Sequence, residues 1–269
     1  KYIGVEDGLS NRRVYAIQKG PKGYMWFLTH DGIDRYNGKD FKPYKLMDGD
    51  EEVNSMMNLN WLYVDPKGTI WEIGKKGRVF RYDTKHDRFV LVYKLPESEV
   101  KGRPTPISYG FVDANSVIWL CNEDALYLYD TQKVTFIQNE IGERITDIAQ
   151  IDSTHFFIGT DIGIHYAELA NNILTLSPCN QLDTLKIQIN ELYYHKPSHK
   201  VFIGTFQRGI FSYDLNKHKV MHIPSGLMDI SINCIRAFND NEILIATDGA
   251  GVYKMNTDTY ASEPYIVAD

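Results

Sequence analysis

One short sequence pattern occurs six times along the chain, and this repetition constrains the fold more than any other feature. Each copy has a turn, an apolar strand, a short and usually Gly-containing loop, and a second strand that ends near an aromatic residue. The copies follow one another at intervals of roughly 40–50 residues, which for short strands is typical of β-propeller blades. The residues at the centre of the six copies are Trp26, Trp71, Trp119, Phe157, Phe202 and Leu244.

Each copy predicts four strands. In the first copy we expect strands at residues 14–17, 24–29, 33–36 and 41–44, with a turn at 20–23. The turn contains Gly and Pro, which suit a tight reversal between two strands. No stretch sustains the 3.6-residue periodicity of an amphipathic helix. The sequence therefore predicts an all-β fold, a β-propeller of four-stranded antiparallel blades with six repeats visible.

We expect residues 1–269 to form a single β-propeller. A four-stranded sheet has two apolar faces, and stacking it between neighbouring sheets buries both of them. The rings of Trp26, Trp71 and Trp119 are therefore expected to be buried between blades. The expected blades span residues 10–46, 54–95, 105–138, 144–177, 188–224 and 231–267.

The first five residues precede the first repeat. We expect residues 1–5 to form a strand that belongs to a preceding blade or completes the last one. This leaves two arrangements open, a six-bladed ring and a seven-bladed parent ring. The chain starts at Lys1 without Met, so we expect it to be a piece of a longer protein.

Composition and spacing exclude several classes of function. A net charge of −6 argues against nucleic acid as a partner. The three cysteines lack the spacing of a metal site. Cys121 and Cys234 fall in apolar runs and are expected to be small buried residues. His195 and His199 are four residues apart, a spacing that aligns ligands on a helix but not in a turn. We expect neither a metal nor a cofactor.

One further segment carries polar side chains, and the sequence has no recognisable catalytic motif. The acidic stretch at residues 48–52 lacks the spaced ligands of a calcium loop, and we expect a solvated connection there. The sequence has no nucleophile elbow, zinc-protease motif, phosphate-binding loop or dinucleotide fingerprint. The chain is therefore expected to be non-catalytic.

Candidate ligand-binding residues lie where the first strand of a repeat begins and in the loop after the second strand. Asn recurs at the first of these positions, and two explanations are open. The amides bond the backbone at the start of the strand, or they bind the hydroxyl groups of a polar ligand such as a sugar. Arg could also pair with a sulfate or a uronate. The candidates are Arg12, Arg13, His30, Lys76, Asn190, Arg208 and Asn233.

The first copy resembles a known family. Residues 7–11, 14–17, 23–26 and 31–38 are similar to the two-component regulator propeller repeat. The resemblance is clear in the second copy and weaker in the third, where residues 122–125 replace the usual Thr-x-x-Gly loop. In the sixth copy Leu244 replaces the aromatic residue. The resemblance covers nearly the whole chain.

This resemblance implies a function and a context. In that family, one or two propellers precede an immunoglobulin-like domain, a membrane helix and a histidine kinase, in hybrid two-component systems of Bacteroides-type bacteria. We therefore expect a periplasmic ectodomain that senses a polysaccharide-derived oligosaccharide or another small polar ligand. Its expected partners are the downstream propeller, immunoglobulin-like and kinase domains, and a homodimer is left open. The alternatives are a propeller enzyme, either a lyase or a glycosidase, and a protein-interaction scaffold.

Overall fold

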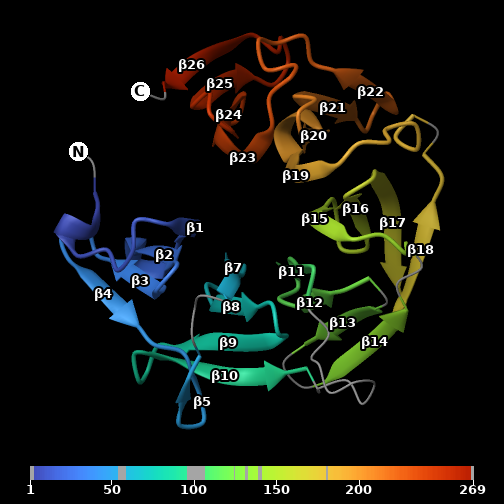
Figure 1. The fold of residues 1–269 in the computed structure, drawn as a ribbon. Coiled ribbons are helices and arrows are strands. Elements are labelled where there is room, and N and C mark those ends of the chain that lie inside the picture. The colour runs from blue at the N-terminus through green and yellow to red at the C-terminus, as the bar shows by residue number, and fades with distance from the viewer. Residues whose placement is uncertain are drawn as a thin grey trace. The chain divides into compact units, whose positions relative to one another are not determined.

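The computed structural model describes residues 3–53, 59–95, 107–123, 125–130, 133–138, 141–179 and 181–267. It contains six four-stranded antiparallel sheets, each built from four strands that are consecutive in the chain (Figure 1). The predicted all-β fold, a propeller with six four-stranded blades, is confirmed. Helical structure in the described residues is limited to the 3-10 turns η1 (Val5–Asp7), η2 (Pro21–Gly23) and η3 (Lys196–Ser198).

The chain divides into two compact units of three blades each. Unit 1 is Lys1–Gln138 and unit 2 is Asn139–Asp269. The first blade of unit 1 consists of β1 (Val14–Lys19), β2 (Met25–Thr29), β3 (Gly32–Tyr36) and β4 (Phe41–Tyr44). The second consists of β7 (Leu59–Val64), β8 (Ile70–Gly74), β9 (Arg78–Asp83) and β10 (Arg88–Lys94). The third consists of β11 (Tyr109–Val112), β12 (Ile118–Cys121), β13 (Ala125–Tyr129) and β14 (Val134–Gln138).

Unit 2 repeats this plan. Its blades are β15 (Ile145–Gln150), β16 (His155–Thr160), β17 (Ile164–Ala170) and β18 (Ile173–Ser177); β19 (Ile189–His195), β20 (Lys200–Thr205), β21 (Ile210–Asp214) and β22 (Lys219–His222); and β23 (Ile232–Asn239), β24 (Glu242–Thr247), β25 (Val252–Asn256) and β26 (Ser262–Ile266). Within each unit the first strands of neighbouring blades lie side by side. In unit 1, β7 contacts both β1 and β11, and in unit 2, β19 contacts both β15 and β23.

A repeated threonine closes the loop between the second and third strands of a blade. The Thr29 hydroxyl donates to the Gly32 carbonyl at 3.1 Å, and the Thr205 hydroxyl donates to the Gly209 carbonyl at 2.7 Å. Both glycines have positive φ angles, of 136° and 67°, which a side chain would strain. The same Thr-to-Gly hydrogen bond therefore closes a Thr-x-x-Gly loop in the first blade and a loop that is one residue longer in the fifth.

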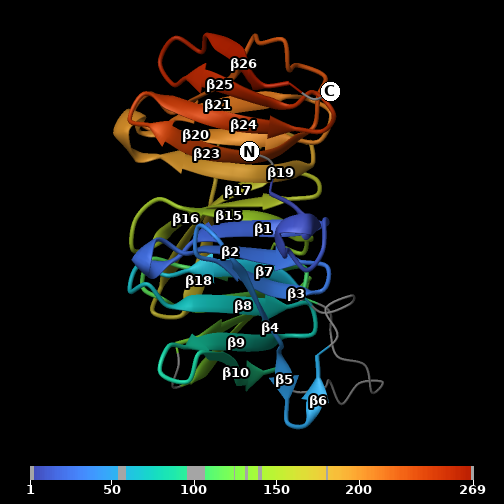
Figure 2. The same cartoon turned by 90° about the vertical axis from the view of Figure 1, so that its left-hand side faces the viewer.

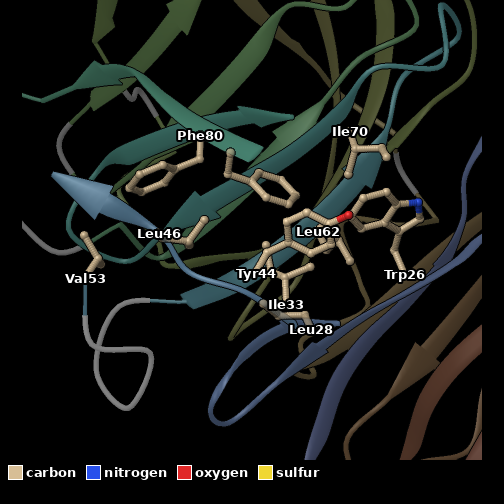
Figure 3. Packing of buried hydrophobic residues seen from close by; sticks show 10 residues of the cluster. Trp26, Leu28, Ile33, Tyr44, Leu46, Val53, Leu62, Ile70 and Phe80 are labelled. Carbon is tan, nitrogen blue, oxygen red and sulfur yellow. The ribbon is translucent and has the colours of Figure 1, made fainter. Parts of the chain in front are cut away.

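The three tryptophans are buried, and Trp26 and Trp71 belong to clusters that join neighbouring blades, as predicted. Trp26, Trp71 and Trp119 are 1%, 2% and 0% exposed. In Figure 3 the Trp26 ring lies beside Tyr44, within a cluster that joins the first two blades. Cys121 is also buried as expected, whereas Cys234 is only partly buried. Burial still raises the pKa of Cys234 to about 11.

The prediction of a strand at residues 1–5 is wrong for its described part. Lys1 and Tyr2 lie outside the described residues, Ile3 and Gly4 have no regular structure, and Val5 begins the 3-10 turn η1. The cause is a local capping arrangement. The Gly4 N–H donates to Asp7 Oδ2 at 3.0 Å, while the Asp7 N–H donates to the Gly4 carbonyl at 3.1 Å.

The acidic segment at residues 48–52 is also more structured than expected. It belongs to a two-stranded ribbon, β5 (Met47–Asp48) and β6 (Glu51–Glu52), which extends beside β10 (Figures 1 and 2). Asp48 accepts hydrogen bonds from Arg78 at 2.9 Å and from Lys94 at 3.0 Å. These two hydrogen bonds, made with the second blade, lower the pKa of the Asp48 carboxyl. The segment is therefore fastened to a blade by ion pairs.

Candidate functional site

The predicted residues of unit 1 lie in loops. Arg12 and Arg13 are exposed just before β1, and the His30 N–H donates to the Arg13 carbonyl at 3.0 Å. The Tyr15 hydroxyl is hydrogen-bonded to His30 Nδ1 at 2.9 Å. Lys76 is exposed in the turn between β8 and β9. The structure therefore brings Arg13 and His30 together within one blade.

In unit 2, Asn190 and the loop containing Arg208 lie beside the start of β23. Asn190 Nδ2 donates to the Ile232 carbonyl at 3.2 Å. This amide therefore supports the backbone of the next blade, in agreement with the structural explanation for the recurring Asn. The Gln207 N–H donates to the Ser231 hydroxyl at 3.0 Å. Two predicted residues remain exposed here, Arg208 and Asn233.

A polar cluster that the sequence analysis missed lies at the start of the fourth blade. His165 Nε2 is 2.9 Å from Glu143 Oε2, which also accepts the Thr160 hydroxyl at 2.5 Å. Beside it, Arg144 Nε donates to Asp161 Oδ2 at 3.4 Å. These residues come from three segments and form no spaced motif, so the sequence alone did not group them.

Each unit has a pocket between its first two blades, near the turn that joins the third and fourth strands of the second of these blades. The pocket of unit 1 has a volume of about 290 Å³. It lies between the first two blades. Its lining residues are Pro21, Lys22, Tyr24, Trp26, Arg35, Gly68, Ile70, Tyr82, Thr84 and Asp87.

Asp87 is the centre of a hydrogen-bond network that holds these two blades together. It accepts hydrogen bonds from Arg35 at 3.0 Å, Tyr44 at 2.6 Å and Tyr82 at 2.5 Å, and it also accepts one from Lys42. Burial alone would raise the pKa of the Asp87 carboxyl. The hydrogen bonds and the nearby Arg35 charge outweigh burial, so this pKa falls below its usual range. Burial, followed by the bond to Asp87, raises the pKa of Tyr44.

The pocket of unit 2 is larger, with a volume of about 470 Å³. The Tyr213 hydroxyl lies 3.3 Å from both Cys179 Sγ and His218 Nδ1. Burial, followed by the contact with Cys179, raises the pKa of Tyr213. The lining residues are Phe157, Tyr166, Ser177, Pro178, Cys179, Gln181, Tyr213, Leu215 and His218.

The two pockets occupy equivalent places in their units. In unit 1 the cross-strand register pairs Trp26 with Arg35 and Arg35 with Lys42, two residues before Tyr44. In unit 2 the same register leads from Phe157 through Tyr166 to Ser177, where β18 ends, and Cys179 follows two residues later. The equivalent residues, unit 1 first, are Trp26 and Phe157, Arg35 and Tyr166, Lys42 and Ser177, Tyr44 and Cys179, Tyr82 and Tyr213, Thr84 and Leu215, Asp87 and His218, and Phe89 and Val220.

Of the two histidines at the predicted turn, His195 is buried and has a structural role. The His195 Nδ1 is hydrogen-bonded to the Ser198 hydroxyl at 2.8 Å. Burial lowers the pKa of His195 and favours the neutral ring. Across the described residues, His, Cys, Asp and Glu side chains do not gather in groups of three that could hold a metal ion. No helix in this part of the chain has both the length and the apolar character needed to span a membrane.

Solved structures match this fold along the whole chain. An extracellular domain assigned to a hybrid two-component system of B. thetaiotaomicron matches with a TM-score of 0.75 and 20% identity, covering 100% of this chain and 37% of that one. An extracellular domain of a second such system from this organism matches with a TM-score of 0.71 and 18% identity, covering 100% and 34%. This chain therefore spans about a third of the length of these two extracellular domains.

A propeller of a different kind is also similar. The dihydro-heme d1 dehydrogenase NirN matches with a TM-score of 0.67 and 15% identity, covering 96% of this chain and 58% of that one. No protein-family model matches the sequence, and a search of curated proteins finds no match. At these identities the similarities establish the propeller fold alone, and proteins that share a fold can differ in function.

Proposed function

We propose that this chain is the ligand-sensing propeller of a periplasmic hybrid two-component sensor. The observation that carries the proposal is the match of the whole chain to extracellular domains assigned to such systems. The repeat motif of the first copy supports the same context. The propeller detects a polysaccharide-derived oligosaccharide without transforming it. Binding favours one arrangement of the parent protein and so changes the activity of its kinase.

The proposed sugar contacts come from the loops at the start of the first strands and after the second strands. In unit 1 these are Arg12, Arg13, His30 and Lys76, and in unit 2 they are Arg208 and Asn233, because the Asn190 amide is already bonded to the Ile232 carbonyl. Arg12, Arg13 and Arg208 are exposed, so their guanidinium groups are accessible to a ligand. Each guanidinium offers five donors, which suit hydroxyl, sulfate and carboxylate oxygens.

Calorimetry of the complete parent ectodomain with a panel of glycan fragments tests this proposal. One fragment should bind, and the Arg12→Ala/Arg13→Ala pair or the Arg208→Ala variant should weaken its binding about tenfold, the effect of losing charged hydrogen bonds. Lys39→Ala is the control, because Lys39 is an exposed cation in the turn between β3 and β4. Unchanged affinity in both Arg variants would refute these sites. Cleavage of a fragment would support the propeller-enzyme alternative instead.

A further inference from the structure

The pocket of unit 2 lacks the side chain that fills the equivalent space in unit 1. In unit 1 the Tyr44 ring lies between the two blades, with centroid distances of 5.4 Å to Trp26, 5.7 Å to Tyr82 and 5.8 Å to Phe89. Its hydroxyl donates to Asp87. The space between these two blades of unit 1 is thus filled by the phenol ring of Tyr44, whose hydroxyl is hydrogen-bonded.

Three of the residues around this place are smaller in unit 2. Cys179 replaces Tyr44, Phe157 replaces Trp26, and Val220 replaces Phe89. Each change removes ring atoms from the same region. The pocket volume rises accordingly, from about 290 Å³ in unit 1 to about 470 Å³ in unit 2.

The remaining walls still present rings and a polar group at the matching positions. Phe157 and Tyr213 are in edge-to-face contact, with ring centroids 5.6 Å apart. Both side chains are buried and line the pocket. His218 occupies the position equivalent to Asp87, which accepts the Tyr44 hydroxyl in unit 1. An imidazole ring can likewise form a hydrogen bond with a hydroxyl group. The turns that carry His218 and Asp87 have the same backbone conformation at these residues, with φ angles of 50° and 49°.

We propose that the pocket of unit 2 binds a small phenolic ligand in the place that Tyr44 occupies in unit 1. The ligand ring packs edge-to-face against Phe157 and Tyr213, an arrangement that aromatic rings prefer. The ligand hydroxyl is hydrogen-bonded to His218. A sugar ring has no aromatic edge or face for such contacts, so this site is separate from the proposed oligosaccharide site and does not depend on it.

NMR titration of the chain with p-cresol tests the proposal, with toluene as the matched probe that lacks the hydroxyl. We expect saturable binding of p-cresol, with chemical-shift changes at Tyr213 and His218, and about fivefold weaker binding of toluene, which corresponds to one hydrogen bond. His218→Ala should remove this preference by weakening only p-cresol. Cys179→Tyr, which restores the ring found in unit 1, should reduce p-cresol binding at least about tenfold.

Cys179→Ala is the control, because it keeps the pocket open and should preserve p-cresol binding. Near-UV circular dichroism checks the folding of each variant. If Cys179→Tyr does not fold, nuclear Overhauser effects from p-cresol to the Phe157 and Tyr213 rings in the wild type give the same answer. The proposal would be overturned by non-saturable binding, by unchanged affinity in folded Cys179→Tyr, or by displacement of p-cresol with methyl glucoside.

Discussion

The two pockets show how one repeated backbone can be completed in two different ways. In unit 1, Asp87 gathers hydrogen bonds from Tyr44, Tyr82 and two cations, so two blades are fastened by a polar network around a filled space. In unit 2, His218 makes one hydrogen bond to Tyr213, and the space beside it is open. The register fixes where these side chains stand. The size and charge of these side chains determine whether the space between the two blades is filled by a hydrogen-bonded network or left as a pocket.

The largest expected difference concerns the residue at the centre of each repeat. Trp26→Ala should lower the free energy of unfolding of unit 1 by about 4 kcal/mol, near the middle of the range for large aromatic truncations. Phe157→Ala should cost about 3 kcal/mol, because Phe157 is smaller and already borders a pocket. Urea denaturation measures both values. An equal or larger loss for Phe157→Ala would mean that the open space does not weaken the packing in unit 2.

The second difference concerns the turn residue between the third and fourth strands. Asp87→Ala leaves the buried Tyr44 hydroxyl without its acceptor, which should cost about 1–2 kcal/mol. Partial exposure of Asp87, at 39% of its side chain, keeps the ion-pair contribution small. His218→Ala should cost less than about 0.5 kcal/mol, as is usual for surface residues. Thermal unfolding of the two variants compares them directly.

The same network predicts a pH dependence. Since the folded-state pKa of Asp87 is depressed, its stabilisation is complete above the unfolded value of about 3.9 and is lost as the pH falls toward the lower folded value. The Asp87→Asn variant should therefore lose less stability than the wild type on acidification below about pH 4. Parallel losses in the two proteins would show that other carboxylates account for the acid sensitivity.

A third difference lies in the second strands, where unit 1 buries an acid and unit 2 an alkyl side chain. Glu72 and its equivalent Ile203 are both fully buried, and neither Glu72 carboxyl oxygen has a hydrogen-bond partner within the described residues. Burial raises the pKa of Glu72 well above its usual value, although the charge of Arg78 offsets part of the effect. Glu72→Ile should therefore stabilise the chain at pH 7 by about 1 kcal/mol.

The pH dependence caused by Glu72 should have the opposite sign to that caused by Asp87, because the folded pKa of Glu72 is raised and that of Asp87 is lowered. Because the folded pKa of Glu72 is raised, keeping its carboxyl protonated in the fold adds no cost below the unfolded value of about 4.3, and this cost grows as the pH rises above it. The advantage of Glu72→Ile should thus shrink between pH 7 and pH 4. Calorimetric melting temperatures across this range measure it. A constant advantage would indicate better packing rather than removal of a charge.

The sequence predicted the six repeats because their spacing, turns and central rings recur within one blade. The start of η1 was missed because the contact between Gly4 and Asp7 is local and competes with strand formation. The pocket of unit 2 was missed for another reason. Phe157, Cys179 and His218 come from two blades and form no motif until the strands are in register. Aligning the repeats could have shown that Cys179 replaces Tyr44, but not that the space stays open.

The smallest expected effect concerns the indole N–H at the centre of the first two repeats. Trp71 Nε1 donates to Asp65 Oδ2 at 3.0 Å, whereas Trp26 Nε1 has no partner in the described part of the chain. The position equivalent to Asp65 is Gly20, where an added Cβ would lie 2.4 Å from Trp26 Nε1. An acid cannot fit there without moving the indole, whose nitrogen points away from Tyr44 in Figure 3.

Phenylalanine substitutions isolate this hydrogen bond, and Trp26→Phe also reproduces the ring that unit 2 has at Phe157. Both substitutions remove the same atoms, so the difference between their unfolding free energies reports the N–H group. Trp71→Phe should cost about 1 kcal/mol more than Trp26→Phe, the net contribution of one hydrogen bond. Asp65 keeps its bonds from the Lys67 and Thr69 N–H groups, which limits the loss. Equal costs in urea denaturation would show that the Trp26 N–H has a partner in solution.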